Sequence, residues 1–203
     1  MSVDVIIRAM VKSNRENEIK LAFPSPETAV RRLLDAGARE IHARAFEDNT
    51  LFDFAQRPLT KSGRLLRLRD FGGASVLTFK VPVLGEHRHK VKVEHETAVA
   101  DPEALRSILL ALGFEVVYRY QKYRAIYALD AVLAALDETS LGTFVELEGA
   151  PDDVDRAAAA LGSRPSEFIR ATYRELQKLD AAARGVVAGD TLLPPPGRPD
   201  SAA

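Results

Sequence analysis

The 203-residue sequence contains no cysteine. This absence excludes disulfides, thiolate metal sites and a cysteine nucleophile, and it is compatible with a reducing compartment. Surplus charge is missing too, because 28 basic residues stand against 29 acidic ones and the formal net charge is −1. The overall balance therefore argues against a nucleic-acid partner or an anionic lipid surface, and a strong field can only come from local segregation of charge.

Long apolar runs are also lacking near the start of the chain. Residues 1–14 carry Asp4 in a broken apolar run, which fits neither a secretory signal nor a membrane span. We therefore predict a cytoplasmic protein with no membrane partner. Residues 180–203 are rich in Gly, Pro and Ala and are predicted to be a disordered tail. The remaining prediction is an N-terminal extension over residues 1–14 and one domain over residues 15–179.

A strand followed by a helix recurs three times in the sequence. Each predicted helix has Pro at its start and Gly at the same distance beyond, over residues 26–37, 102–113 and 151–162. A Glu-x-Glu doublet precedes each helix, at Glu16 and Glu18, Glu94 and Glu96, and Glu146 and Glu148. A further helix is predicted near the end of the domain, where Ile169, Tyr173 and Leu176 have helical spacing.

Short extended segments separated by turn residues fill the rest of the domain. Together with the opening segment they predict about eight strands, at residues 16–23, 40–53, 63–71, 75–80, 89–99, 115–129, 131–138 and 143–149. Most follow one another directly, so antiparallel pairing is expected. Eight strands are enough to close a barrel that holds either side chains or one small ligand.

Charged and apolar residues alternate along nearly every predicted strand. A sheet with one solvated face gives the same alternation, and each strand alone is read that way more often than not. Paired like charges at two-residue spacing repel one another on a bare surface, however, and indicate that opposite charge lies among them. If the charged faces point into a barrel, its lumen holds a basic group (Lys20, Arg67, Arg69, Lys80, Lys122 and Arg124) and an acidic group (Glu16, Glu18, Asp137, Glu146 and Glu148). A polyphosphate with divalent cations would satisfy both groups.

Several segments resemble, in order, the motifs of the CYTH superfamily, also called triphosphate tunnel metalloenzymes. They are Glu16-Asn17-Glu18-Ile19-Lys20, which matches the family's ExExK signature, and "DNTLFD", "GRLLRLR", "LTFKVP", "YQKYR" and "LDETSLGTFVELEG". The resemblance implies an α+β fold, a closed eight-stranded antiparallel barrel or tunnel with helices on the outside. It also implies binding of a triphosphate with Mg²⁺ or Mn²⁺. By position, the acidic group would lie on the metal side and the basic group on the phosphates.

The roles of a few residues stay open from the sequence. Glu94 and Glu96 would contact the metal, support its ligands, or form salt bridges with Lys90 and Lys92. Lys20 would act as a phosphate clamp or, if the lumen lowers its pKa, assist as a base. A metal site at His87 and His89 is disfavoured because hard oxygen ligands suit Mg²⁺ better. Tyr118, Tyr120, Tyr123 and Tyr127 are interpreted as strand packing.

Three functions remain in competition. The preferred one is hydrolysis of an inorganic or organic triphosphate, such as tripolyphosphate or thiamine triphosphate. The second is class IV-type adenylate cyclisation, which converts ATP to cyclic AMP and pyrophosphate and needs a nucleoside pocket at the tunnel mouth. No base-recognition motif is visible in the sequence. The third is a binding module without turnover, which five carboxylates near the phosphates disfavour. A homodimer is implied by resemblance only.

Overall fold

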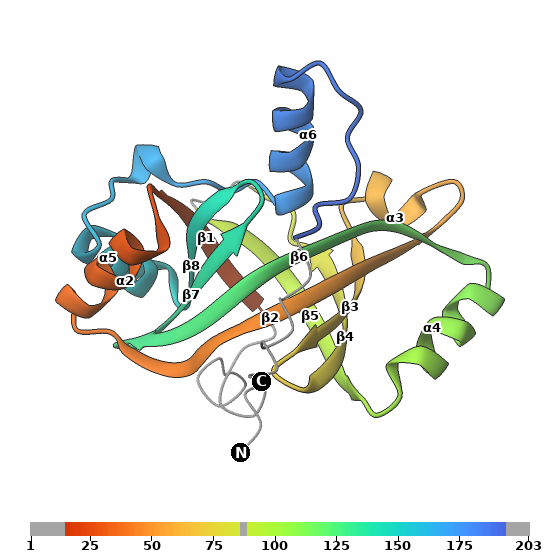
Figure 1. Cartoon of the computed structure of the whole chain (residues 1–203), viewed down its shortest axis with the longest axis horizontal. Helices are drawn as coiled ribbons and strands as arrows, with labels where there is room; N and C mark the ends of the chain where they lie inside the picture. Colours follow the sequence, from red (N-terminus) through yellow and green to blue (C-terminus); the bar gives the residue numbers. More distant parts are fainter. Residues whose placement is uncertain (1–14, 86–88, 194–203) are drawn as a thin grey trace, which may run out of the picture.

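The computed structural model describes residues 15–85 and 89–193, and these residues form a closed barrel. The barrel's strands follow the order β1-β5-β4-β3-β2-β6-β7-β8, and every neighbouring pair is antiparallel. The predicted fold class, an α+β closed eight-stranded barrel with helices outside, is confirmed (Figure 1). The strands are β1 (Arg15–Phe23), β2 (Arg39–Phe54), β3 (Leu65–Phe71), β4 (Ala74–Pro82), β5 (Lys90–Val99), β6 (Phe114–Leu129), β7 (Val132–Thr139) and β8 (Gly142–Glu148).

The barrel's apolar core lies on its outside, beneath the helices. The three predicted Pro-to-Gly helices are α2 (Pro26–Asp35), α4 (Pro102–Ala111) and α5 (Pro151–Ala160). α2 and α5 lie together over β1, β7 and β8 (Figure 1) and bury Leu33 and Val154 completely. α4 covers the other side, where Leu109 packs with Phe52. Because side chains alternate across a strand, this outward apolar face leaves the charged face for the lumen.

The helix that ends the domain begins later than the sequence predicted. Ile169 lies in extended backbone and exchanges two hydrogen bonds with the backbone of Lys20, at 2.9 and 3.0 Å, so its predicted place in the helix was wrong. A short 3-10 turn (Pro165–Glu167) precedes it, and α6 runs over Tyr173–Ala183. Thr172 and Glu175 form a capping box, which satisfies the first free N–H groups and sets the start of the helix.

The segment after α6 returns to the barrel. The predicted tail starts inside α6, and its part up to Leu193 packs against β6. Thr191 donates its N–H to the Arg119 carbonyl (2.9 Å) and accepts from the Gln121 N–H (2.9 Å), and its buried hydroxyl hydrogen-bonds Tyr118. α6 is therefore fastened to β1 on one side, through Ile169, and to β6 on the other (Figure 1). Residues 1–14 and 194–203, with their predicted extension and tail, lie outside the described residues.

Among the described residues, no helix is long and apolar enough to cross a membrane. The cytoplasmic location and the homodimer stay predictions.

Candidate functional site in the barrel lumen

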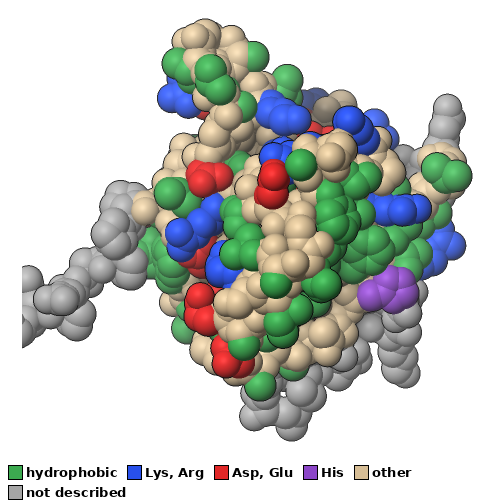
Figure 2. All heavy atoms as spheres, turned by 90° about the vertical axis from the view of Figure 1, so that its right-hand side faces the viewer, with side chains coloured by type: hydrophobic (Ala, Val, Ile, Leu, Met, Phe, Trp, Pro, Cys, Tyr) green, Lys and Arg blue, Asp and Glu red, His purple; other side chains and the backbone are tan. Residues whose placement is uncertain are grey.

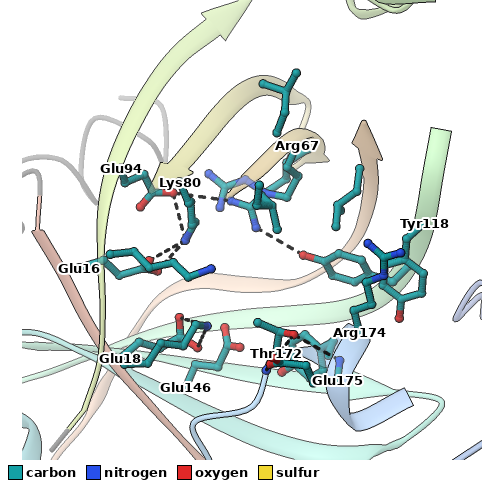
Figure 3. A pocket seen from close by; sticks show the side chains of 18 of the residues that line it. Glu16, Glu18, Arg67, Lys80, Glu94, Tyr118, Glu146, Thr172, Arg174 and Glu175 are labelled. Atoms are coloured by element: carbon teal, nitrogen blue, oxygen red, sulfur yellow. Dashed lines mark hydrogen bonds and ion pairs between the residues drawn. The ribbon is translucent and has the colours of Figure 1, made fainter. Parts of the chain in front are cut away.

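A cavity of about 370 Å³ runs inside the barrel and is lined mostly by charged side chains (Figure 3). Every residue of the predicted basic group lines it, as do four of the five predicted carboxylates. Glu94 and Glu96 line it as well, together with Lys90 and Lys92. These residues come from strands that are far apart in the sequence, and the strand register places them side by side, with Lys20 opposite Glu146 and Glu18 opposite Glu148.

Lys80 forms ion pairs with both Glu16 and Glu94 at one end of the cavity. Its Nζ lies 2.7 and 2.8 Å from the two carboxylate oxygens of Glu16 and 3.1 Å from Glu94 Oε1, as the dashed lines in Figure 3 show. Burial raises the pKa of Glu16, with Glu18 and Glu94 adding to the effect and Lys80 opposing it. Burial and the nearby ammonium groups of Lys90 and Lys80 lower the pKa of Lys92 to about 8.

Lys20 lies between the carboxylates of β1 and β8. Its Nζ is 3.2 Å from Glu18 Oε1 and 2.7 Å from Glu146 Oε1. Burial alone would lower the pKa of Lys20, but Glu146 and Glu18 together raise it above its ordinary value. Burial likewise opposes ionisation of Glu18, yet Lys90 at 3.3 Å and Lys20 hold the pKa of Glu18 well below its usual range. Lys20 therefore keeps its proton, which favours the clamp over the base.

Glu148 differs from the other lumen carboxylates. It faces Glu18 across the β1–β8 ladder, and among residues 15–85 and 89–193 it has no recorded ion pair or hydrogen bond. Burial, followed by the charge of Glu16, raises the pKa of Glu148 to about 8. The site thus contains a carboxylate that no protein cation neutralises by direct contact.

Asp137 does not reach the cavity, although the sequence placed it with the metal-side carboxylates. It is fully buried and accepts from Arg124 Nε (2.6 Å), Arg124 Nη2 (2.7 Å), Lys122 Nζ (2.9 Å) and the Tyr173 hydroxyl (2.6 Å). In this arrangement Asp137 is the counter-ion that holds Lys122 and Arg124 in place.

Glu47 is a second buried counter-ion, and the sequence analysis missed it. Its carboxylate is fully buried, 3.3 Å from Lys122 Nζ and 3.7 Å from Arg124 Nε, and it accepts from Asn49 Nδ2 at 2.9 Å. Burial opposes ionisation, but Lys122, Arg124 and the arginines of β3 hold the pKa of Glu47 well below its usual range. Glu47 is opposite Lys122 in the register of β2 with β6, so both side chains point to the same face of the sheet. The alternation of residues along β2 could therefore have indicated that Glu47 points inward.

Arg67 of β3 has looser contacts than Arg124. Arg67 donates at 3.4 Å to the Tyr120 hydroxyl and to Thr78 Oγ1, and its nearest carboxylate, Glu94, is 3.9 Å away. Arg69 is 3.9 Å from Glu96. Within the described part of the chain, the buried Nε–H of Arg67 has no hydrogen-bond acceptor. A charged donor is therefore left without an acceptor in the wall of the cavity.

Aromatic side chains line the end of the cavity nearest α6. Tyr118 and Tyr120, interpreted from the sequence as strand packing, stack on each other at 5.6 Å and also line the cavity. Arg174 of α6 lies over the Tyr118 ring at 5.8 Å (Figure 3). In the side view of Figure 2, several Lys and Arg side chains lie below the projecting α6, with Asp and Glu side chains among them.

None of the histidines that the structure describes lines the cavity. His89 is buried against α5, where its Nε2 is 2.7 Å from Asp155 Oδ1, and His87 lies outside the described residues. In the described part of the chain, no three acidic or histidine side chains are already close enough together to hold a metal ion. Lysines and arginines stand between the lumen carboxylates instead.

Comparison with known proteins identifies the fold and its relatives. The sequence profile of the CYTH domain matches residues 14–179. An adenylate cyclase candidate of Methanocaldococcus jannaschii, MJ0240, is 29% identical over 175 residues, which cover 81% of this chain and 99% of that protein. The structure of the PH1819 protein of Pyrococcus horikoshii is similar with a TM-score of 0.70 and 25% identity, over 81% of this chain and 99% of that one.

A plant protein shares the fold at lower identity. The structure of HpAC1, an adenylyl cyclase candidate of Hippeastrum that revealed a dominant triphosphatase activity, gives a TM-score of 0.54 and 20% identity, over 85% of this chain and 96% of that one.

Proposed function

Because the chain belongs to the CYTH domain family, we propose that it is a metal-dependent hydrolase of triphosphates that bind in the barrel lumen. Proteins of this family bind triphosphates and are typically metal-dependent. The substrate would be tripolyphosphate or an organic triphosphate, and the reaction would be hydrolysis.

The free Nε–H of Arg67 carries the proposal. A buried charged donor without an acceptor is unfavourable, and a phosphoryl oxygen is the acceptor that a guanidinium group binds best. Arg69, Lys80 and Lys20 line the same cavity, and their charges would meet the remaining phosphoryl oxygens. Lys122 and Arg124 would be held ready for the same anion by Asp137 and Glu47.

The carboxylates of β1 and β8 have the chemistry to hold Mg²⁺ or Mn²⁺. Hard oxygen donors lie on these adjacent strands at Glu16, Glu18, Glu146 and Glu148, and no cation of the described residues is in direct contact with Glu148. A polyphosphate would also bring excess negative charge to a lumen whose own charges already pair with one another. When bound, the metal would neutralise phosphoryl charge and polarise an attacking water.

The chain's own residues would bind and orient the phosphoryl groups. Lys20 keeps its proton between Glu18 and Glu146 and therefore acts as an electrostatic clamp. Arg67 and Arg69 would fix the phosphoryl groups from β3, on a different part of the wall from Lys20. Such pre-set charges stabilise a phosphoryl-transfer transition state without reorganising when the charge develops.

Adenylate cyclisation is the second candidate. It is favoured by the aromatic end of the cavity at Tyr118 and Tyr120, which could hold a base, and by the M. jannaschii relative named for that activity. Hydrolysis requires fewer groups to be positioned, because no ribose has to be held in line with the α-phosphorus. HpAC1 also illustrates that a protein with this fold can be named for one activity and show the other.

The test is a product analysis. Purified protein is incubated with tripolyphosphate, thiamine triphosphate or ATP, each with Mg²⁺ or Mn²⁺, and orthophosphate, pyrophosphate and cyclic AMP are measured. Orthophosphate release supports hydrolysis, whereas cyclic AMP with equal pyrophosphate refutes it in favour of cyclisation. Tight binding without any product would leave only a binding module.

Two arginine variants test the role given to the unpaired Nε–H of Arg67. Arg67→Lys keeps the charge but removes the unpaired Nε–H, and we expect it to raise the KM for tripolyphosphate about tenfold. Arg119→Lys, on the outer face of β6 where Arg119 pairs with Asp48, is the control and should leave the KM unchanged. Equal KM values for the two variants would contradict the role given to Arg67.

A further inference from the structure

Tyr173 is the first residue of α6, and its side chain turns away from the helix into the lumen. The ring is buried, with Phe144 edge-on at 5.7 Å and Tyr120 at 6.0 Å. Two ammonium groups lie over it: Lys20 Nζ is 4.6 Å and Lys122 Nζ is 5.0 Å from the ring centroid. Both distances are within the range of a cation–π interaction, which is strongest for charges removed from water.

The hydroxyl of Tyr173 holds a third member of the same cluster. It donates to Asp137 Oδ2 at 2.6 Å, the oxygen that also accepts from Lys122 Nζ at 2.9 Å. Burial and the charges of Asp137 and Glu146 raise the pKa of Tyr173 well above its ordinary value, and the hydrogen bond to Asp137 adds to the effect, so the phenol stays neutral. One side chain therefore touches both lysines and the counter-ion of one of them.

Lysine side chains are long and flexible, so their ammonium groups need fixed neighbours to keep one position. Glu18 and Glu146 contact Lys20, and Asp137 and Glu47 contact Lys122. Glu146 also reaches Lys122, but only at 4.0 Å, the outer limit of an ion pair. Tyr173 is a second shared neighbour, with both ammonium groups over its ring, and unlike Glu146 of β8 it belongs to a helix fastened to β1 and β6.

We propose that Tyr173 is a positioning residue that fixes the ammonium groups of Lys20 and Lys122 against the bound phosphates and links their placement to α6. The inference rests on the proposed function, because it assumes that phosphates bind at these lysines. Tyr173 is thereby added to the lumen residues, although no motif in the sequence indicates it.

The first measurement needs neither substrate nor metal. The Hε protons of the two lysines are followed by ¹H–¹³C NMR and assigned with Lys20→Arg and Lys122→Arg. A ring beneath each ammonium group shifts these signals upfield. We expect the shift to persist in Tyr173→Phe and to disappear in Tyr173→Leu. Unmoved lysine signals in Tyr173→Leu would overturn the proposal.

The second measurement is the affinity for tripolyphosphate in EDTA, by calorimetry. We expect Tyr173→Leu to weaken binding about tenfold and Tyr173→Phe, which keeps the ring, to stay within about threefold of wild type. Tyr123→Leu is the matched control, because it removes a tyrosine ring that lies against Arg44 away from the cavity. Its affinity should equal that of wild type.

Three outcomes would refute the role of the ring. They are wild-type affinity in Tyr173→Leu, equal losses in the Leu and Phe variants, and an equal loss in Thr191→Val, which loosens the segment behind α6 without touching the lysines. If wild type bound no tripolyphosphate in EDTA and none with Mg²⁺ present, the proposed function would be refuted instead, and the lysine signals would still decide whether the ring holds the two ammonium groups.

Discussion

Replacing Asp137 by Asn tests whether this residue is a structural counter-ion. The buried carboxylate receives four hydrogen bonds from Arg124, Lys122 and Tyr173. Removing one partner from a buried ion pair costs about 3–5 kcal/mol, because the other charge stays buried without compensation. Glu47, 3.3 Å from Lys122 and 3.7 Å from Arg124, compensates in part, so we expect the lower end of that range, about 3 kcal/mol.

Such a loss is large for one domain, whose free energy of unfolding is typically about 5–15 kcal/mol. It can be measured by urea unfolding in EDTA, followed by circular dichroism. With an m-value of about 2 kcal/mol/M, the midpoint should fall by about 1.5 M urea.

Glu148→Gln is the matched control, since it makes the same carboxyl-to-amide change at a residue with no ion-pair partner among the described residues. Burial and Glu16 oppose the ionised form of Glu148, so we expect this variant to unfold at the same or a higher urea concentration. If Asp137→Asn stayed within about 1 kcal/mol of wild type while Glu148→Gln lost about 3, the counter-ion role would be refuted.

Three further predictions follow from the other contacts. Replacing Glu16 and Glu18 together by Gln should abolish turnover through loss of metal while the circular dichroism spectrum is unchanged, and full activity would contradict the site assignment. Thr172→Ala removes the side-chain cap of α6 and should destabilise the helix by about 1 kcal/mol, seen as faster hydrogen exchange over residues 173–183; unaltered protection would count against it. Leu33→Ala leaves a cavity beneath α2, where Leu33 is fully buried, and should lower the free energy of unfolding by about 2–5 kcal/mol in urea, so a loss below about 1 kcal/mol would show that the site collapses or packs differently.

Much of the barrel could be predicted because its rules are local. The alternation of Arg67 and Arg69 with Leu66 and Leu68 gives the two faces of a strand whatever its partners are. Gly37, Gly113 and Gly162 take positive φ values of 86°, 89° and 83°, which glycine adopts readily, and the sequence therefore marked the ends of all three repeated helices. Most of the strand lysines and glutamates that line the cavity were found in the same way, whereas Glu175 and Lys178 of α6 were not.

The errors have one cause, which is that pairing across the chain cannot be read from spacing. Ile169 has helical spacing with Tyr173. The pairing of β1 with β5 ends at Glu18, however, so the edge of β1 at Lys20 is open and the backbone of Ile169 hydrogen-bonds to it instead. Thr191 lies in a segment that composition marks as a tail, yet β6 offers it an unpaired edge.

The sequence by itself determined which side of each strand faces the inside of the barrel, because side-chain direction in a strand depends on residue parity. Tertiary structure alone decided what each of them does there. It set Asp137 and Glu47 behind Lys122 and Arg124 and brought Tyr173 from the last helix to lie beneath two lysines. It also left Glu148 without an ion-pair partner among residues 15–85 and 89–193. The reason is physical: a charge takes its role from the charges that share its low-dielectric surroundings, and in a closed barrel those neighbours come from strands far apart in the chain.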